Sequence, residues 1–358
     1  MPLSDIALPV AVGAVLSLVP LAGPAPAADA STAACKGART CYVDVSVAQI
    51  WESPDKVRPV DAKALTNPVD IRGWFAAMAH DLDLRRGVPG ETQALYGGRV
   101  TVVETTTRNG VLWDKVLVHG QPTPRDAGGY PGWVPDRLLT KHRKKDPYGT
   151  TPERITSATA WGHPTPESLA AGAPAEGATE YSYNTEFAVK PVPGEPSLVE
   201  ARANDGSPIY FERDDFEEVP SSGVTGADVV AEARKFTGLD YLWSGTAGFG
   251  YDCSGLTSQV YSALGITIPR DSQPQYDAGG GRAPAGSAEG ERITSTADLR
   301  PGDIVAFGAG TSNVTHVGIY VGRNAQGEPM MINSPRTGEK VREEPLSNRP
   351  FVGATRFL

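Results

Sequence analysis

One cysteine stands where a thiol can act as a nucleophile. Cys253 lies in the segment Tyr251-Asp252-Cys253-Ser254-Gly255-Leu256, at the expected start of a helix. The positive end of a helix dipole and unpaired backbone N–H groups lower the pKa of a thiol and favour the thiolate. The same N–H groups can hold a developing oxyanion. The position therefore predicts acyl-transfer chemistry, although a lone cysteine is more often a small buried apolar residue.

A thiol nucleophile needs a base and a polar group that orients the base. His316 is the only histidine in the C-terminal third of the chain, and it heads an expected strand in which Gly318 leaves room beside the imidazole. Asn333, on the next expected strand, can accept a hydrogen bond from the ring N–H. A single histidine of this kind is more often a surface or core residue, but the three residues together favour a catalytic group.

The other two cysteines are Cys35 and Cys41, six positions apart. In an oxidising compartment such a pair closes a small disulfide loop, and the alternative is two free surface thiols. The chain has no CxxC and no HExxH segment, which excludes most zinc frameworks. We expect no metal and no organic cofactor.

The N-terminal thirty residues have the pattern of a secretory signal. Ile6–Gly23 is an uncharged apolar run, and Ala25 and Ala27 form an A-x-A cleavage pattern after it. The usual positive residues before the run are missing, and Asp5 stands there instead, so the signal is atypical or the start codon is misplaced. A transmembrane anchor is the alternative. We expect a secreted or cell-wall-associated protein with a signal peptide at 1–30.

Composition narrows the class of partner. The formal net charge of −9 makes nucleic acid and anionic lipid poor partners. A hydrophobic fraction of 40% is enough for packed cores, and 358 residues suggest two or three domains. The 40 glycines and 31 prolines favour short strands and turns over helical bundles.

The first two structural domains are expected to be all-β. Residues 35–145 have alternating apolar segments on both sides of Asn109-Gly110, a strong hairpin signal, and one helical insertion at Ile71–Leu84. Residues 146–220 carry further short strand patterns. The pattern therefore predicts two small β-domains, at 35–145 and at 146–220.

The remainder, residues 221–358, has a different pattern. Thr225 is expected to cap one helix, and Cys253 to begin another whose apolar stripe ends at Gly265. Strands are expected at 303–307, 316–321 and 330–333. Helices followed by an antiparallel sheet indicate an α+β layout.

Three segments of this last part resemble the NlpC/P60 cysteine peptidases of bacterial cell-wall turnover. They are Asp252–Leu256 (DCSGL), Leu299–Phe307 (LRPGDIVAF) and Thr315–Gly322 (THVGIYVG). They occur in the family's order and at ordinary spacing, and the resemblance covers residues 224–358. It implies a papain-like core with no cofactor.

The resemblance also implies catalytic roles. Cys253 would be the nucleophile, His316 the base and Asn333 the third polar residue, where many family members have histidine. Asparagine can orient an imidazole but cannot carry charge, so the pKa of His316 is expected to differ. Tyr241, in the segment Tyr241–Gly245 that is similar to the family's Y-x-W-G-G, would offer its hydroxyl near the oxyanion.

The N-terminal part resembles bacterial SH3 (SH3b) domains. The likeness is carried by Trp51–Asp55, Glu91–Gly97 and Gly129–Pro135, and it is weaker over residues 153–219. It is greatest to γ-D-glutamyl-L-diamino acid endopeptidases, in which two SH3b domains precede the NlpC/P60 domain. The fold class implied is multidomain, with two small all-β SH3b-like barrels followed by an α+β papain-like NlpC/P60 domain.

In that group the first SH3b domain closes one end of the cleft, so that only a stem peptide with a free N-terminal L-Ala fits. The residues that would meet its α-ammonium are Glu91, Tyr130 and Asp271. The residues that would hold the D-Glu α-carboxylate and line its subsite are Trp243, Asp252, Ser254 and Ser272.

The resemblance therefore predicts a secreted cysteine endopeptidase that hydrolyses the γ-D-glutamyl–diamino acid bond of peptidoglycan stem peptides or muropeptide fragments. We expect a monomer that binds no nucleic acid and no membrane once the signal is removed.

Two alternatives stay open at this point. One is an amidase or acyltransferase on the same cysteine–histidine core. The other is a non-catalytic cell-wall-binding protein that uses its SH3b domains.

Overall fold

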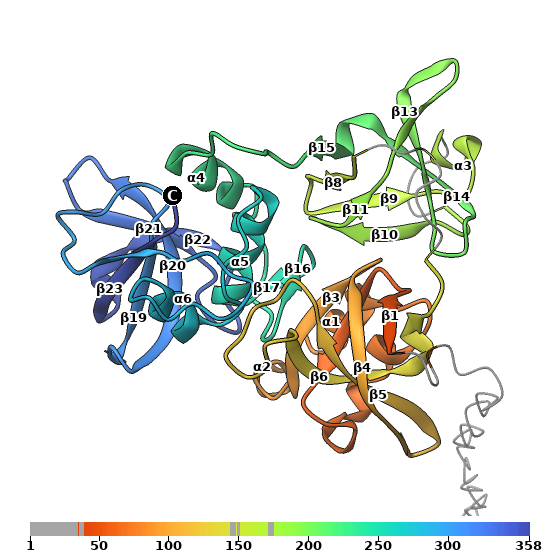
Figure 1. Cartoon of the computed structure of the whole chain (residues 1–358), viewed down its shortest axis with the longest axis horizontal. Coiled ribbons are helices and arrows are strands. Elements are labelled where there is room, and N and C mark those ends of the chain that lie inside the picture. The colour runs from red at the N-terminus through yellow and green to blue at the C-terminus, as the bar shows by residue number, and fades with distance from the viewer. Residues whose placement is uncertain (1–34, 36–38, 144–147, 149–150, 171–174) are drawn as a thin grey trace, which may run out of the picture.

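The computed structural model describes residues 35, 39–143, 148, 151–170 and 175–358. The predicted signal at 1–30 lies outside these residues. Figure 1 shows three parts in chain order: an N-terminal part in orange to yellow, a middle part in green and a C-terminal part in cyan to blue. None of the helices in the described part of the chain combines the length and apolar character needed to cross a bilayer.

The N-terminal part contains a seven-stranded antiparallel sheet with the strand order β3-β2-β6-β5-β4-β1-β7. Its strands are β1 (Thr40–Val43), β2 (Val47–Trp51), β3 (Gly90–Leu95), β4 (Arg99–Arg108), β5 (Val111–Val118), β6 (Tyr130–Pro135) and β7 (Leu139–Thr140), with a 3₁₀ turn η4 (Asp136–Leu138) before β7. The expected hairpin at Asn109-Gly110 joins β4 to β5, with φ of 51° and 75° at its two residues. Positive φ at both positions is what a type I′ turn requires. The SH3b assignment of this part stays a prediction.

The insertion after β2 differs from the single helical segment expected at Ile71–Leu84. It has two short helices, α1 (Ile71–Ala77) and α2 (Leu82–Arg86), after the 3₁₀ turns η2 (Pro54–Lys56) and η3 (Pro59–Leu65). The break has a local cause, because the Asp81 carboxylate accepts hydrogen bonds from the N–H groups of Asp83 and Leu84 and so caps a new helix.

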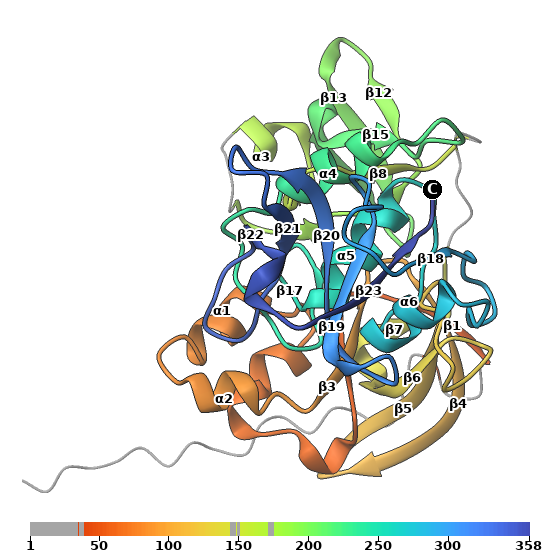
Figure 2. The same cartoon turned by 90° about the vertical axis from the view of Figure 1, so that its left-hand side faces the viewer.

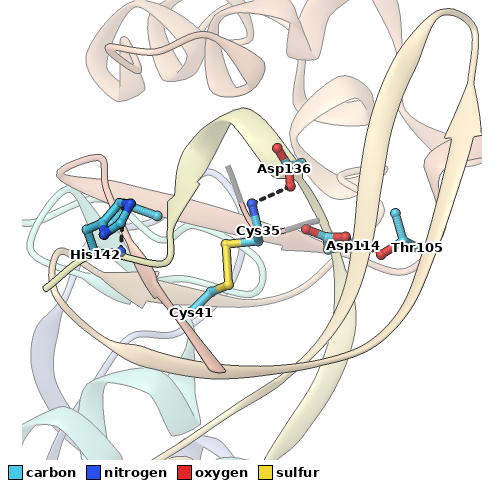
Figure 3. The surroundings of a disulfide bond; sticks show 7 residues. Cys35, Cys41, Thr105, Asp114, Asp136 and His142 are labelled. Atoms are coloured by element: carbon cyan, nitrogen blue, oxygen red, sulfur yellow. Dashed lines mark hydrogen bonds between the residues drawn. A yellow bond between two sulfur atoms is a disulfide. The ribbon is translucent and has the colours of Figure 1, made fainter. Parts of the chain in front are cut away.

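A disulfide joins Cys35 to Cys41 at the edge of the same sheet (Figure 3). The backbone N–H of Cys35 donates to Oδ1 of Asp136 at 2.9 Å, and both sulfur-bearing residues lie in the core with Val43 and Val100. The disulfide therefore ties Cys35 to β1, and the hydrogen bond ties it to the turn before β7.

The middle part consists of three small antiparallel sheets around an aromatic core that includes Tyr181, Phe187 and Phe211. Its elements are β8 (Glu153–Ile155), β9 (Thr159–Gly162), α3 (Pro166–Ala170), β10 (Thr179–Ser182), β11 (Glu186–Phe187), β12 (Lys190–Val192), β13 (Glu195–Arg202), β14 (Pro208–Glu212), η5 (Arg213–Asp215) and β15 (Phe216–Glu218). Short α3 was not predicted.

The C-terminal part has a six-stranded antiparallel sheet, in the order β18-β23-β19-β20-β21-β22, with helices packed on one face. The elements are α4 (Gly226–Arg234), β16 (Thr246–Ala247), β17 (Gly250–Tyr251), α5 (Cys253–Ala263), α6 (Ser272–Ala278), β18 (Glu291–Ile293), β19 (Ile304–Gly310), β20 (Asn313–Arg323), β21 (Pro329–Asn333), β22 (Arg342–Pro345), η6 (Leu346–Asn348) and β23 (Phe351–Arg356). In Figure 2 this sheet lies nearest the viewer, in front of α4 and α5. The arrangement is the α+β layout expected for this part.

The helices are placed by side-chain alternation on β20. Val317 and Ile319 face α4 and α5 in one core, whereas Tyr320 belongs to a second core on the opposite face of the sheet. Thr225 caps α4 with a reciprocal bond pair to Asp228, as a capping box does.

The N-terminal sheet contacts the C-terminal part directly before the cysteine helix. The backbone N–H of Thr246 donates to the side-chain oxygen of Gln93 on β3, and the Thr246 hydroxyl donates to the Gln93 backbone carbonyl. Both distances are 3.0 Å. Gln49 on β2 donates to Oγ of Ser244, also at 3.0 Å. Because these groups are buried, the segment that leads into α5 is held by the edge of another domain.

The middle part is joined to α4 by a buried charge cluster. Glu232 on α4 accepts from the Tyr183 hydroxyl at 2.5 Å and from Arg154 of β8 at 3.3 Å. The Tyr183 ring packs edge-on against Phe236. A buried cation and a buried anion thus compensate each other across two parts of the chain.

Replacing Glu232 by alanine is expected to lower the free energy of unfolding by about 3–5 kcal/mol, because it leaves the Arg154 charge without its buried partner. The Arg154 side chain is only 2% exposed. Urea denaturation followed by circular dichroism measures the change. Glu217→Ala is the matched control, because Glu217 also contacts Arg154 but is 55% exposed, and it should cost less than about 1 kcal/mol. Equal losses in the two variants would contradict this account.

Candidate active site

Cys253 is the first residue of α5, as the sequence predicts. Asp252 is the N-cap, and its side chain accepts the N–H of Gly255 at 2.6 Å. Cys253 lies in the same core as Val317, and the backbone N–H groups of Val317 and Ser254 are close enough to the thiol to favour its thiolate form. Since Val317 follows His316 in the chain, the thiol lies against the β20 segment that carries the histidine.

The expectation that the helix start would lower the pKa of this thiol is wrong for this structure. Burial, followed by the negative charge of Asp252, raises the pKa of Cys253 to about 12. The N–H groups of Val317 and Ser254 and the charge of Arg270 oppose the shift without cancelling it. Desolvation of a thiolate outweighs the few favourable dipoles at the helix end.

His316 and Asn333 come together on neighbouring strands. The Nε2 atom of His316 lies 2.8 Å from Oδ1 of Asn333, and both side chains are buried. Gly318 makes this possible, because a Cβ there would stand 3.0 Å from Cβ of Asn333. The Asn333 contact engages Nε2 and leaves Nδ1 as the ring nitrogen that can accept a proton.

The imidazole is neutral near pH 7. Burial and the positive charge of Arg349 lower the pKa of His316 to about 4, against the opposing effects of Asn333, Glu344 and Asp252. With the thiol pKa raised and the imidazole pKa lowered, the resting pair is a neutral thiol and a neutral base. In the predicted roles of nucleophile and base, attack would require proton transfer from sulfur to nitrogen as the new bond forms.

Tyr241 lies close enough to Cys253 for the two to interact electrostatically. Burial, with the charges of Cys253 and Asp252, raises the pKa of its phenol well above the usual value. The hydroxyl therefore keeps its proton and can donate to an oxyanion. Its backbone carbonyl accepts from Arg85 of α2 at 2.7 Å, so the insertion of the N-terminal part helps to hold it.

Arg270 belongs to the site but was not among the residues predicted from the sequence. It is buried and forms a two-pronged ion pair with Asp252, at 2.7 and 3.1 Å. It also donates to Oγ of Ser254 at 2.9 Å and to the Thr92 hydroxyl of β3 at 2.9 Å. Its place directly before Asp271 and Ser272, which were both assigned to substrate binding, was the available signal.

The residues predicted to meet an ammonium group converge at the border of the two domains. The Tyr130 hydroxyl donates to Oδ1 of Asp271 at 3.2 Å. Arg125 forms a two-pronged ion pair with Glu91, at 2.5 and 2.9 Å, and also reaches the Tyr130 hydroxyl at 3.3 Å. The guanidinium thus lies against Glu91 and Tyr130, two of the three residues predicted to hold a cation, and Arg125 was not predicted.

The remaining predicted residues have mixed surroundings. The Ser254 hydroxyl donates to Asp252 at 3.2 Å, and Ser272, the first residue of α6, donates to the Val314 carbonyl at 3.3 Å. Trp243 is 49% exposed and lies at the surface. Within the described residues no group of three or more histidine, cysteine, aspartate or glutamate side chains is arranged to hold a metal ion.

The pH dependence of kcat/KM on a peptide substrate follows from the histidine. Because the base form of His316 is needed and its pKa is lowered to about 4, the acid limb is expected near pH 4. Initial rates between about pH 3 and about pH 9 measure it. A midpoint at the ordinary histidine value of 6.5 would contradict the burial argument.

Comparison with known proteins gives concordant matches. A family model described as "NlpC/P60 family" matches residues 238–356. A protein of Bacillus cereus named γ-D-glutamyl-L-lysine dipeptidyl-peptidase is 36% identical over 88% of this chain and 90% of its own length. A protein of the same name from Bacillus subtilis is 31% identical over 83% of this chain and 90% of its own length.

A solved structure agrees over almost the same extent. The crystal structure of an NlpC/P60 family protein from Bacillus cereus is 33% identical to this chain, with a TM-score of 0.73 over 89% of this chain and 99% of that one. The similarity therefore includes the N-terminal and middle parts as well as the segment that carries Cys253 and His316. The chain belongs to the NlpC/P60 family of peptidases.

Proposed function

We propose that this protein is a secreted cysteine endopeptidase that cleaves the γ-D-glutamyl–diamino acid bond of peptidoglycan stem peptides carrying a free N-terminal L-Ala. The arrangement of Cys253, His316 and Asn333 carries the proposal. The relatives named γ-D-glutamyl-L-lysine dipeptidyl-peptidase, which match most of the chain, support the choice of bond. The structural match across all three parts supports a site built between domains.

The reaction follows from the side chains. Nδ1 of His316 takes the thiol proton while sulfur attacks the γ-carbonyl carbon, and the Tyr241 hydroxyl donates to the oxyanion that forms. The imidazolium then gives its proton to the leaving amine as the C–N bond breaks, which leaves a thioester on Cys253. Water attacks the thioester while His316 takes its proton. The C–S bond then breaks, the D-Glu γ-carboxylic acid leaves, and the imidazolium returns the proton to sulfur.

Substrate selection is assigned to the domain border. In the proposal Glu91, Tyr130 and Asp271 hold the α-ammonium of L-Ala, since carboxylate and phenol oxygens are suited to a cation. The contacts of Arg125 with Glu91 and Tyr130 support this assignment, because these two residues already hold a positive group, and Tyr130 is hydrogen-bonded to Asp271. The hydroxyls of Ser254 and Ser272 would receive the D-Glu α-carboxylate beside the buried guanidinium of Arg270, and Trp243 would line that subsite.

Secretion is a separate part of the proposal. It rests on the apolar run and cleavage pattern within residues 1–30 and on the disulfide of Cys35 with Cys41, which is typical of oxidising compartments. Recovery of the protein only from the cytoplasm, with residues 1–27 attached, would contradict it.

The selectivity test compares L-Ala-γ-D-Glu-diaminopimelate with its N-acetylated form. Loss of a charge-assisted contact is expected to lower kcat/KM for the acetylated peptide by about 10–100-fold. Glu91→Gln should reduce this preference, and Cys253→Ala should abolish turnover of both peptides. Mass spectrometry of the products identifies the bond. Equal rates on the two peptides would overturn the L-Ala requirement, and full activity of Cys253→Ala would overturn the peptidase mechanism.

Arg125 and a substrate ammonium would compete for the Glu91 carboxylate. Arg125 is 43% exposed, so its ion pair is expected to be worth no more than about 1 kcal/mol. Arg125→Ala should therefore lower KM for the free peptide by up to about fivefold with kcat unchanged. Lys56→Ala, which removes another exposed ion pair, serves as the control and should leave KM unaltered. A rise in KM for Arg125→Ala would show that the guanidinium assists binding.

A further inference from the structure

We propose that Glu344 is a positioning residue of the catalytic machinery: its carboxylate fixes the orientation of the Asn333 amide and thereby determines which nitrogen of His316 carries the proton. The inference rests on the proposed peptidase function and adds a fourth member behind the cysteine, histidine and asparagine. Glu344 lies on β22, the edge strand next to β21.

The side-chain amide of Asn333 can take two orientations, and the backbone does not determine which one it adopts. An asparagine side chain has an oxygen that accepts and a nitrogen that donates, and the two orientations have nearly the same shape. If the oxygen faces His316, Nε2 carries the proton and Nδ1 is the base. If the nitrogen faces His316, Nε2 must accept, the proton moves to Nδ1, and the imidazole can no longer take the thiol proton.

The contacts on the other side of the amide settle this choice. Nδ2 of Asn333 donates to Oε1 of Glu344 at 3.2 Å and to the Arg342 carbonyl at 3.4 Å, while Oδ1 lies 2.8 Å from Nε2 of His316. An ionised carboxylate and a backbone carbonyl can only accept. A reversed amide would therefore place its oxygen against two acceptors.

Burial makes the wrong orientation costly. Asn333 is 0% exposed and Glu344 is 7% exposed. Solvent therefore has little access to replace a lost partner, and a polar group left unpaired in such a site loses its full hydration. The carboxylate thus selects one amide orientation and, through it, one imidazole tautomer.

Arginine side chains keep Glu344 ionised. Arg342 donates to Oε2 from Nε and its terminal nitrogen, at 3.1 and 2.9 Å, and Arg349 reaches Oε1 at 3.4 Å. Burial alone would raise the pKa of Glu344, but the contacts with Arg342 and Asn333 reverse the shift and lower it. Oε1 thus stays an acceptor for Asn333.

Glu344 also supplies a negative charge near the imidazole, which the neutral side chain of Asn333 cannot provide. The charged groups that act on His316 are Arg349, which disfavours the imidazolium, and Glu344 and Asp252, which favour it; Arg342 lies behind Glu344. When His316 accepts the thiol proton, the carboxylate beyond the amide offsets part of the new charge. The neutral third residue is therefore backed by a negative one.

A double-mutant cycle tests the inference. Glu344→Ala is expected to lower kcat by about 10–100-fold with little change in KM, because the tautomer is no longer fixed. In an Asn333→Ala background the same change should have no further effect. Glu344→Gln keeps the shape of the side chain, so it covers the case in which Glu344→Ala fails to fold. Its kcat should lie between those of wild type and Glu344→Ala, and the acid limb of its pH profile should shift to lower pH. Glu343→Gln, on the same strand but paired outward with Arg234, is the matched control and should keep wild-type rates.

A substrate-free measurement separates this inference from the proposed function. ¹⁵N NMR of the histidine rings, with His316 assigned from a His316→Gln variant, should show the Nε2–H tautomer in wild type and a mixture in Glu344→Ala. If wild type cleaves no stem peptide, the proposed function fails, while the tautomer result still decides the role of Glu344. Additive losses in the cycle, or an unchanged tautomer in Glu344→Ala, would overturn the inference.

Discussion

A buried guanidinium is stable only when an opposite charge and hydrogen-bond acceptors compensate for the lost water. Arg270 is such a group, and the arrangement of the site depends on its partners. Its charge is matched by Asp252, its donors are shared with Ser254, and its Nε reaches Thr92 of the N-terminal sheet. Asp252 in turn caps the helix that begins with the nucleophile. The start of α5, the position of Cys253 and the packing of two domains therefore depend on one buried ion pair.

The electrostatics of the nucleophile show how burial competes with local dipoles. A helix start favours a thiolate, but here the thiol is enclosed by β20 and the neighbouring Asp252 carries negative charge. The histidine is enclosed as well, and Arg349 discourages its protonation. Both effects favour the neutral forms, so the enzyme stores no ion pair at rest. In the proposed mechanism, charge separation is therefore confined to the step in which sulfur attacks, where nearby donors can stabilise it.

Local patterns in the sequence predicted the features that depend on neighbouring residues. The Asn109-Gly110 hairpin, the Thr225 cap and the position of Cys253 at a helix start all follow from short segments, and the structure has each of them. His316 and Asn333 followed from the need of a thiol for a base and an orienting polar group, and the resemblance to known motifs assigned them the same roles. Neither source could give the pKa of the thiol, because desolvation depends on strands that are far away in the chain.

The residues that escaped prediction are those whose partners are remote or whose strand has no signature. Arg270 meets Thr92 across 178 positions, and Arg125 meets Glu91 across 34. Glu344 lies on a strand that reads Arg-Glu-Glu-Pro, without the alternation that identifies strands, so its place behind Asn333 could not be foreseen. The hydrogen bonds between Gln93 and Thr246 also join segments that are far apart in the chain. Edge strand β3 of the N-terminal sheet supplies the hydrogen bonds that hold the segment before α5. The N-terminal sheet therefore forms part of the support of the C-terminal part. If the C-terminal part were fused to a different protein, it would need another edge strand at this position.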